Sequence, residues 1–125
     1  MNWQWLAANT GRIVDLSLAH LKIAVPAIVL AFVIAVPLGW AAHRTPRLRE
    51  LIVVASGMVF VVPSLAMFIL MPLVLGTSIL SPLNVVAAMT LYGVALMVRA
   101  AADAFDTVPS SVQQSAIAAG YAPAR

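Results

Sequence analysis

Long apolar runs, separated by short polar segments, dominate the chain. The first run extends from residue 23 to 42 and the second from 51 to 75, and neither contains a charged residue. A helix of about 20 residues is about 30 Å long, which matches the hydrocarbon thickness of a bilayer. Ten residues of the first run and fifteen of the second are Val, Ile, Leu or Phe, which favour membrane insertion most strongly. The pattern predicts two transmembrane helices, 21–42 and 51–75.

A third apolar run, 85–98, is shorter and less hydrophobic. Only six of its fourteen residues are Val, Leu or Ile. It reaches across a bilayer only if the helix continues to residue 102 and Arg99 extends its charged end to the interface. Its small residues suit close packing against other helices. We therefore expect a third transmembrane helix, 85–102, that packs among other helices.

Prolines interrupt the first two runs. Pro26 and Pro37 lie in the first run, and Pro63-Ser64 lies near the middle of the second. Proline removes a backbone donor and kinks a helix, and lipid cannot satisfy the carbonyl groups that are freed. The Pro63-Ser64 pair is either a kink that helps packing or a break that lines a pathway for a solute.

The charges of the polar segments predict the topology. Segment 43–50 contains three arginines, whereas segment 76–84 contains no cation. The positive-inside rule places the first on the cytoplasmic side and the second outside, with the N-terminus also outside. Residues 1–20 then form an external or interfacial segment. Trp3 and Trp5 either lie at the membrane–water boundary or belong to a frayed terminus.

Residues 103–125 return to the cytoplasmic side and predict a short helix. Either of two capping boxes fits its start, Ser110 with Gln113 or Ser111 with Gln114, and Gly120 fits its end. Val112, Ala116 and Ala119 give this helix a modest apolar stripe. The segment lacks the basic face of a lipid-binding helix, so contact with a protein is the better expectation.

Composition excludes several classes of function. The chain is 63% hydrophobic and only 9% charged, too few charges to coat a soluble domain, for which about a quarter is usual. The net charge of +3 forms no basic stripe with aromatic residues, so no nucleic-acid partner is expected. There is no cysteine, and His20 and His43 suit the membrane interface better than a metal site. No phosphate-binding loop or catalytic set occurs, so we expect no enzyme activity, cofactor or metal.

Three passages carry a family resemblance. The first is Val36-Pro37-Leu38-Gly39, at the end of the first run. The second is Val62-Pro63-Ser64-Leu65-Ala66, followed by Pro72-Leu73-Val74-Leu75-Gly76-Thr77. The third is Leu91-Tyr92-Gly93 through Arg99, followed by Val108-Pro109 and by Gln114-Ser115-Ala116-Ile117-Ala118-Ala119-Gly120. From about residue 16 to its end, the chain resembles the permease subunit of binding-protein-dependent ABC importers of the osmoprotectant group, which carry glycine betaine, choline, carnitine or proline. The resemblance implies the N-terminal part of a type I ABC permease fold: about three transmembrane helices and a short cytoplasmic coupling helix, in the inner (plasma) membrane.

The end of the chain resembles the cytoplasmic loop motif of that family, Glu-Ala-Ala-x-x-x-Gly. Gln114, Ser115 and Ala116 occupy the first three places and Gly120 the last, so two of the three leading residues differ and the acidic charge is absent. The resemblance implies that this coupling helix docks on a separate ATPase subunit. It also implies alternating access with a second permease subunit, and delivery of the solute by an extracytoplasmic binding protein. Family permeases continue beyond this motif, which suggests a fragment or a truncated reading frame.

Four polar residues within or beside the apolar runs are candidates for a translocation path. They are Ser64, Asn84, Thr90 and Tyr92. For each of them, a simpler role in packing or in hydrogen bonding between helices is the preferred interpretation. Asp103 and Asp106 lie three residues apart and are expected to be solvated at the cytoplasmic end rather than to bind a metal. The alternative is that the chain is a small oligomerising structural or regulatory membrane protein without transport activity. No motif in the sequence identifies the solute.

Overall fold

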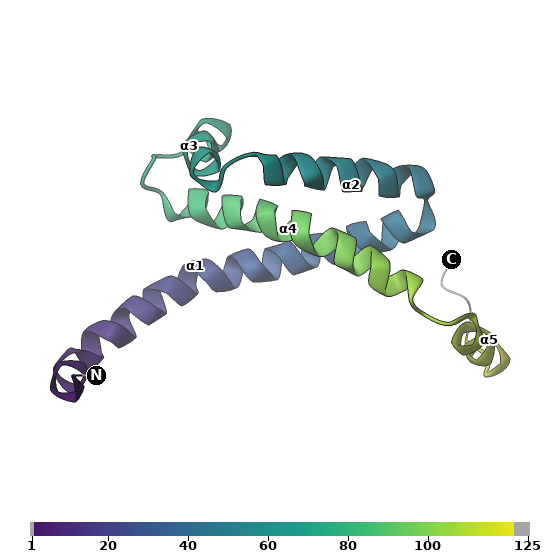
Figure 1. The fold of residues 1–125 in the computed structure, drawn as a ribbon, viewed down its shortest axis with the longest axis horizontal. Coiled ribbons are helices and arrows are strands. Elements are labelled where there is room, and N and C mark those ends of the chain that lie inside the picture. Colours follow the sequence, from purple (N-terminus) through teal and green to yellow (C-terminus); the bar gives the residue numbers. More distant parts are fainter. Residues whose placement is uncertain (1, 122–125) are drawn as a thin grey trace.

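The computed structural model describes residues 2–121, which form five helices and no strand (Figure 1). The helices are α1 (Trp3–Arg44), α2 (Pro46–Val61), α3 (Ser64–Leu75), α4 (Pro82–Asp106) and α5 (Ser110–Ala118). Two of them, α1 and α4, are long and apolar enough to cross a membrane, and α2 with α3 makes a third span if the bent pair counts as one. The expected all-α fold, with helices that could span a membrane, is confirmed at this level.

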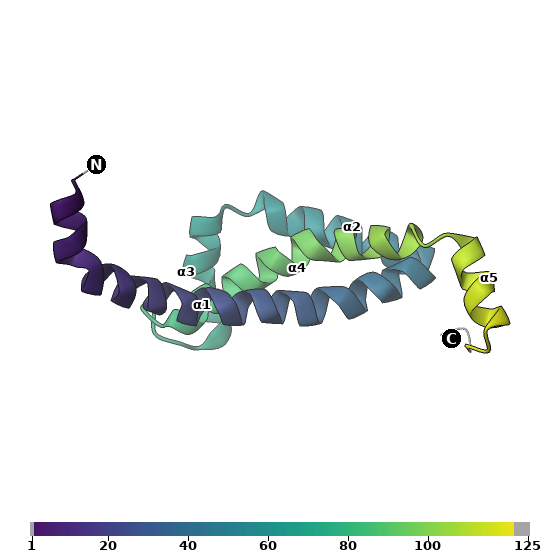
Figure 2. The same ribbon diagram turned by 90° about the horizontal axis from the view of Figure 1, so that it is seen from below.

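Helix α1 is longer than the apolar run from which it was predicted. It has 42 residues, because the segment before residue 21 is helical and continuous with the span. The side chain of Asn2 caps its start by accepting a hydrogen bond from the backbone N–H of Trp5 at 3.2 Å. Its first turns project away from the other helices, as Figures 1 and 2 show. Trp3 and Trp5 are exposed there, at 68% and 59%.

Helices α1 and α4 pack through small residues. The buried face of α1 consists of residues spaced mostly four apart: Ala27, Ala31, Ala35, Gly39 and Ala42. A Cβ atom added to Gly39 would lie 2.5 Å from the Cβ atom of Ala101, and one added to Gly93 would lie 2.6 Å from that of Ala31. The two backbones therefore approach as closely as glycine and alanine permit, which is a packing mode typical of membrane helices.

The second apolar run does not form one straight span. It forms α2 and α3, which meet at an angle of 105° at Val62 and Pro63. Pro63 cannot donate a backbone hydrogen bond, and Val62 is extended at φ −73° and ψ 121°, as residues before proline prefer to be. Gly76 ends α3 in the left-handed region at φ +64°, which glycine adopts without strain. This bend is much sharper than an ordinary proline kink.

Helix α4 is long enough to span a bilayer alone, since its 25 residues extend past both ends of the predicted 85–102. The capping predicted for α5 is wrong: Ser110 and Ser111 lie inside the helix, and no side chain caps its start. The backbone carbonyl of Pro109 instead accepts the N–H groups of Val112 and Gln113, at 3.0 and 3.4 Å. The extended ψ of Pro109, 141°, fits its place as the residue before the first turn.

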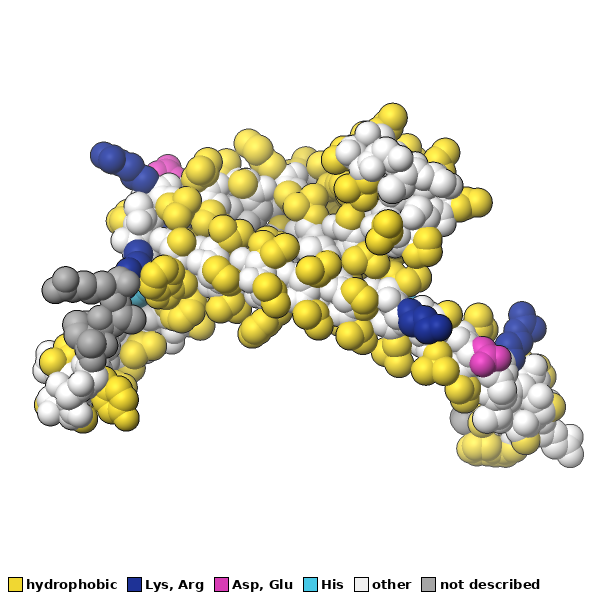
Figure 3. Space-filling model, turned by 180° about the vertical axis from the view of Figure 1, so that it is seen from behind, with side chains coloured by type: hydrophobic (Ala, Val, Ile, Leu, Met, Phe, Trp, Pro, Cys, Tyr) yellow, Lys and Arg dark blue, Asp and Glu magenta, His cyan; other side chains and the backbone are white. Residues whose placement is uncertain are grey.

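Apolar side chains cover much of the outer surface. In Figure 3 they spread over the middle of the molecule, and the charged groups visible on that face lie toward its two ends. Large residues on this surface include Phe32 at 55%, Met58 at 66% and Leu73 at 79% exposure. A surface of this kind is stable against lipid or other apolar helices rather than against water.

Candidate functional site

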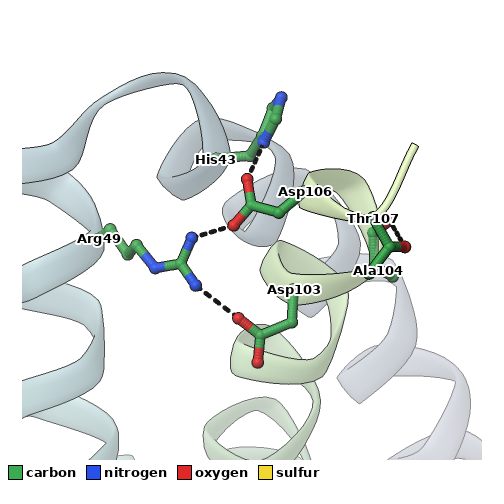
Figure 4. A network of polar contacts seen from close by, with 6 residues as sticks. All are labelled: His43, Arg49, Asp103, Ala104, Asp106 and Thr107. Atoms are coloured by element: carbon green, nitrogen blue, oxygen red, sulfur yellow. Dashed lines mark hydrogen bonds and ion pairs between the residues drawn. The ribbon is translucent and has the colours of Figure 1, made fainter. Parts of the chain in front are cut away.

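An ion-pair cluster joins three helices where α1 ends, α2 begins and α4 ends. It consists of His43, Arg49, Asp103 and Asp106, and Figure 4 shows the two carboxylates facing the arginine. Nδ1 of His43 donates to Oδ1 of Asp106 at 2.5 Å, and Nη2 of Arg49 donates to Oδ1 of Asp103 at 2.5 Å. Nη1 of Arg49 donates to the other oxygen of Asp106. One guanidinium thus holds two carboxylates that lie one helical turn apart.

The cluster lies beyond the apolar part of α4, and its side chains are between one third and just over one half exposed. The hydrogen bonds from Arg49 and then His43 lower the pKa of Asp106, because both stabilise its charged form. The same contact with Asp106 raises the pKa of Arg49. Since water screens ion pairs at this exposure, the cluster fixes the relative positions of the helices more than it adds to stability.

The sequence interpretation missed these contacts. It expected Asp103 and Asp106 to be solvated and His43 to lie at the interface, whereas the structure brings all three side chains into one network with Arg49. A signal was present, because the predicted topology places segments 43–50 and 103–125 on the same side of the membrane. The first segment is rich in arginine and the second begins with two aspartates. Charge complementarity between them would have predicted the pairing.

Tyr92, one of the four candidate path residues, lies at the bend between α2 and α3. Its hydroxyl donates a hydrogen bond to the backbone carbonyl of Val62, which has no helical partner there. The rings of Tyr92 and Phe60 meet edge to face with centroids 6.2 Å apart. Tyr92 therefore satisfies a carbonyl group that lipid could not satisfy.

Asn84 organises the segment that connects α3 to α4. It is only 2% exposed, and its Oδ1 accepts a hydrogen bond from the hydroxyl of Thr77 at 2.5 Å. Its Nδ2 donates to the carbonyls of Ser78 and Ile79 at 2.8 and 3.4 Å. The side-chain amide is thus engaged on both sides, which is the arrangement of a residue that holds a turn.

Thr90 and Ser64 differ in their surroundings. The hydroxyl of Thr90 donates across to the carbonyl of Ala27 on α1 at 3.5 Å, whereas Ser64 is exposed at the start of α3. Thr90 also lines an open cleft of about 600 Å³ between α1, α4 and the end of α3. The cleft is lined mostly by Leu, Ile and Val, with Thr77 as its other polar residue. An apolar wall of this kind fits an acyl chain or a neighbouring helix better than a zwitterion.

The residues expected to contact an ATPase all lie on or just after α5. Gln114, Ser115 and Ala116 are exposed, and the Ser115 hydroxyl donates to the carbonyl of Ser111 at 2.8 Å. Gly120 adopts φ +88°, and the N–H of Tyr121 returns to the carbonyl of Ala116 at 3.0 Å. Helix α5 has no buried residue and contacts none of the other helices. Its whole surface is therefore accessible.

No group of three or more His, Cys, Asp or Glu residues suited to a metal occurs among residues 2–121. Comparisons with protein-family models, with curated proteins and with solved structures gave no match.

Proposed function

We propose that the chain is a permease component of an ABC importer, which moves a small solute of the osmoprotectant class across the plasma membrane by alternating access. The spans α1, α2–α3 and α4 contribute to the transmembrane part, beside a second permease subunit. Helix α5 is the coupling helix and docks on a separate ATPase subunit in the cytoplasm. An extracytoplasmic binding protein delivers the solute.

The observation that supports this proposal best is the isolation of α5. A nine-residue helix that follows a membrane span directly, buries nothing and contacts no other helix needs a partner for its apolar residues. It projects beyond the end of the bundle that carries the ion-pair cluster (Figure 1). This is the end that the arginines of segment 43–50 assign to the cytoplasm.

Co-purification with an ATPase subunit tests the proposal. The chain is expressed with candidate ABC ATPase subunits from its own source, and any complex is isolated in detergent through a tag on the permease. Ala116→Arg buries an unpaired charge in the expected contact and should lower the retained ATPase by about tenfold. Ile79→Arg, at a site that is 80% exposed in the connection between α3 and α4, is the matched control and should retain it.

Failure of the unsubstituted chain to retain any ATPase contradicts the proposal. Stable homo-oligomers in detergent, without ATPase, would favour the alternative of a structural or regulatory membrane protein.

A further inference from the structure

Arg99 lies inside the apolar part of α4. It precedes Asp106 of the ion-pair cluster by seven residues, so it lies about 10 Å further along the helix toward the opposite side of the membrane. Helical side chains lean toward the N-terminus of their helix, which for α4 is the direction away from the cluster. To reach the cytoplasmic interface at the cluster, as the sequence led us to expect, the side chain of Arg99 would have to extend in the opposite direction.

The surroundings of Arg99 agree with a position at depth. Arg99 lines a small cleft of about 140 Å³ with Leu96 of its own helix and Phe60 of α2, among others. Phe60 follows Arg49 by eleven residues, or about 16 Å along α2, so the cleft extends well inside the apolar part of the bundle. The cleft also includes Ser56, which is 7% exposed.

Within residues 2–121, the chain supplies no counter-charge to Arg99. It contains four acidic residues, Asp15, Glu50, Asp103 and Asp106. The two aspartates of α4 bind Arg49, Asp15 lies in the outer part of α1, and Glu50 lies in the first turns of α2. Arg99 takes part in none of the ion pairs of residues 2–121. A charged side chain at membrane depth is costly and is normally paired within a helix bundle.

The face around Arg99 is shaped for a close helix. A Cβ atom added to Gly57 would meet nothing within 4 Å, so the backbone of α2 is open to approach at this point. Small residues at a lipid-facing position allow a second helix to come near and bring a polar group into contact. Arg99 presents five N–H donors in a planar fork that matches a carboxylate.

A second copy of residues 2–121 does not supply the missing charge. In a parallel pair related by an axis along the membrane normal, each residue meets residues of its own depth. No acidic residue of the chain shares the depth of Arg99, because Asp103 and Asp106 lie at the polar end and Asp15 and Glu50 outside the apolar runs. Neither one copy nor a parallel pair of copies of these residues therefore places a carboxylate at the depth of Arg99.

We propose that the face of α2 and α4 around Arg99 binds a transmembrane helix of another polypeptide, which carries an Asp or Glu side chain at the depth of Arg99. The carboxylate pairs with the guanidinium, and Ser56 and Gly57 allow the two backbones to approach. This inference does not depend on the transport function.

The association of the chain with a synthetic transmembrane peptide tests the proposal. The full chain, with a fluorescent donor on the single cysteine of an Ile79→Cys variant, is reconstituted in phosphatidylcholine vesicles with an acceptor-labelled Leu/Ala transmembrane peptide. The peptide carries Glu, Gln or Leu at the depth of Arg99. We expect energy transfer to report association with the Glu peptide about tenfold tighter than with the Leu peptide. Arg99→Met should abolish that preference, and Arg99→Lys should retain part of it.

Arg47→Gln is the matched control, because it removes an exposed arginine outside the ion-pair cluster and should leave the preference unchanged. Circular dichroism of each variant checks that the helices form. Equal association with the Glu and Leu peptides, or a preference that persists in Arg99→Met, overturns the proposal. If adding phosphatidylglycerol removes the preference for Glu, Arg99 binds lipid phosphate instead, and the proposal fails as well.

Discussion

The hydroxyl of Tyr92 on α4 donates to the carbonyl of Val62, the residue at which α2 gives way to α3. The bend of 105° frees backbone groups at this point, and a side chain from a neighbouring helix satisfies one of them. Tyr92 therefore stabilises the bend as well as packing against it.

Replacing Tyr92 by Phe removes only this hydroxyl. Because the carbonyl of Val62 then loses its partner, we expect the free energy of unfolding to fall by about 1 kcal/mol. Unfolding of the detergent-solubilised protein in increasing sodium dodecyl sulfate measures it. Tyr121→Phe, at a site that is 73% exposed, is the control and should have no effect. Equal stability of the two variants would contradict a role for Tyr92 at the bend.

Enlarging Gly39 should separate α1 from α4. In Gly39→Ala the new Cβ atom lies 2.5 Å from the Cβ atom of Ala101 and 3.0 Å from the backbone nitrogen of Ala102, so the backbones must move. We expect a loss of about 1–3 kcal/mol, measured by the same unfolding titration. Gly11→Ala, where a Cβ atom meets nothing within 4 Å, should be neutral or slightly stabilising. A stable Gly39→Ala would show that the contact is looser than described.

The stabilising effect of the ion-pair cluster should depend on pH. Since the pKa of Asp106 is below its ordinary value of 3.8, its stabilising effect is fully present above that value and is lost as the pH falls through the lower, folded pKa. Between about pH 5 and pH 8 the Asp106–Arg49 pair should therefore stay intact. Carbon-13 NMR of labelled aspartate measures this pKa. Arg49→Gln should raise it toward 3.8, whereas Arg47→Gln should leave it unchanged.

Single cysteines test the proposed topology, because the natural chain has none. In spheroplasts, a membrane-impermeant maleimide should label Ile79→Cys, which is 80% exposed, and should label Arg47→Cys only after lysis. The charge difference between the two connecting segments is the basis of this expectation. The reverse labelling pattern would invert the orientation and place α5 outside.

The all-α class and the presence of membrane-spanning segments could be predicted from the sequence, because uncharged apolar runs of about 20 or more residues are typical of transmembrane helices. The length of α1 could not, since residues 3–20 are only moderately apolar and become helical in continuity with the span. The angle between α2 and α3 at Pro63 also could not be predicted from the sequence. A proline indicates a disturbance, but its size depends on partners such as Tyr92 that lie 30 residues away.

For the polar contacts, too, the sequence predicted the general location but not the partners. The topology places Arg49 on the same side as Asp106, yet only the packing of α1 against α4 and α2 brings their atoms together. The capping of α5 was predicted wrongly because Pro109 already supplies a backbone acceptor at the first turn, which leaves the serine hydroxyls without that role.

The seam of Ala and Gly residues between α1 and α4 determines which parts of the molecule can move. Few rotatable side chains lie in that seam, so its two helices cannot slide past each other by changing rotamers and should behave as one rigid body. The contact of α3 with α4 instead involves Met67 and Met71, whose flexible side chains adapt to changes in shape. Helix α2 buries only Ser56. Any large displacement within the described bundle therefore falls to α3 and to the part of α2 beyond the ion pairs of Arg49, which turn against a fixed pair.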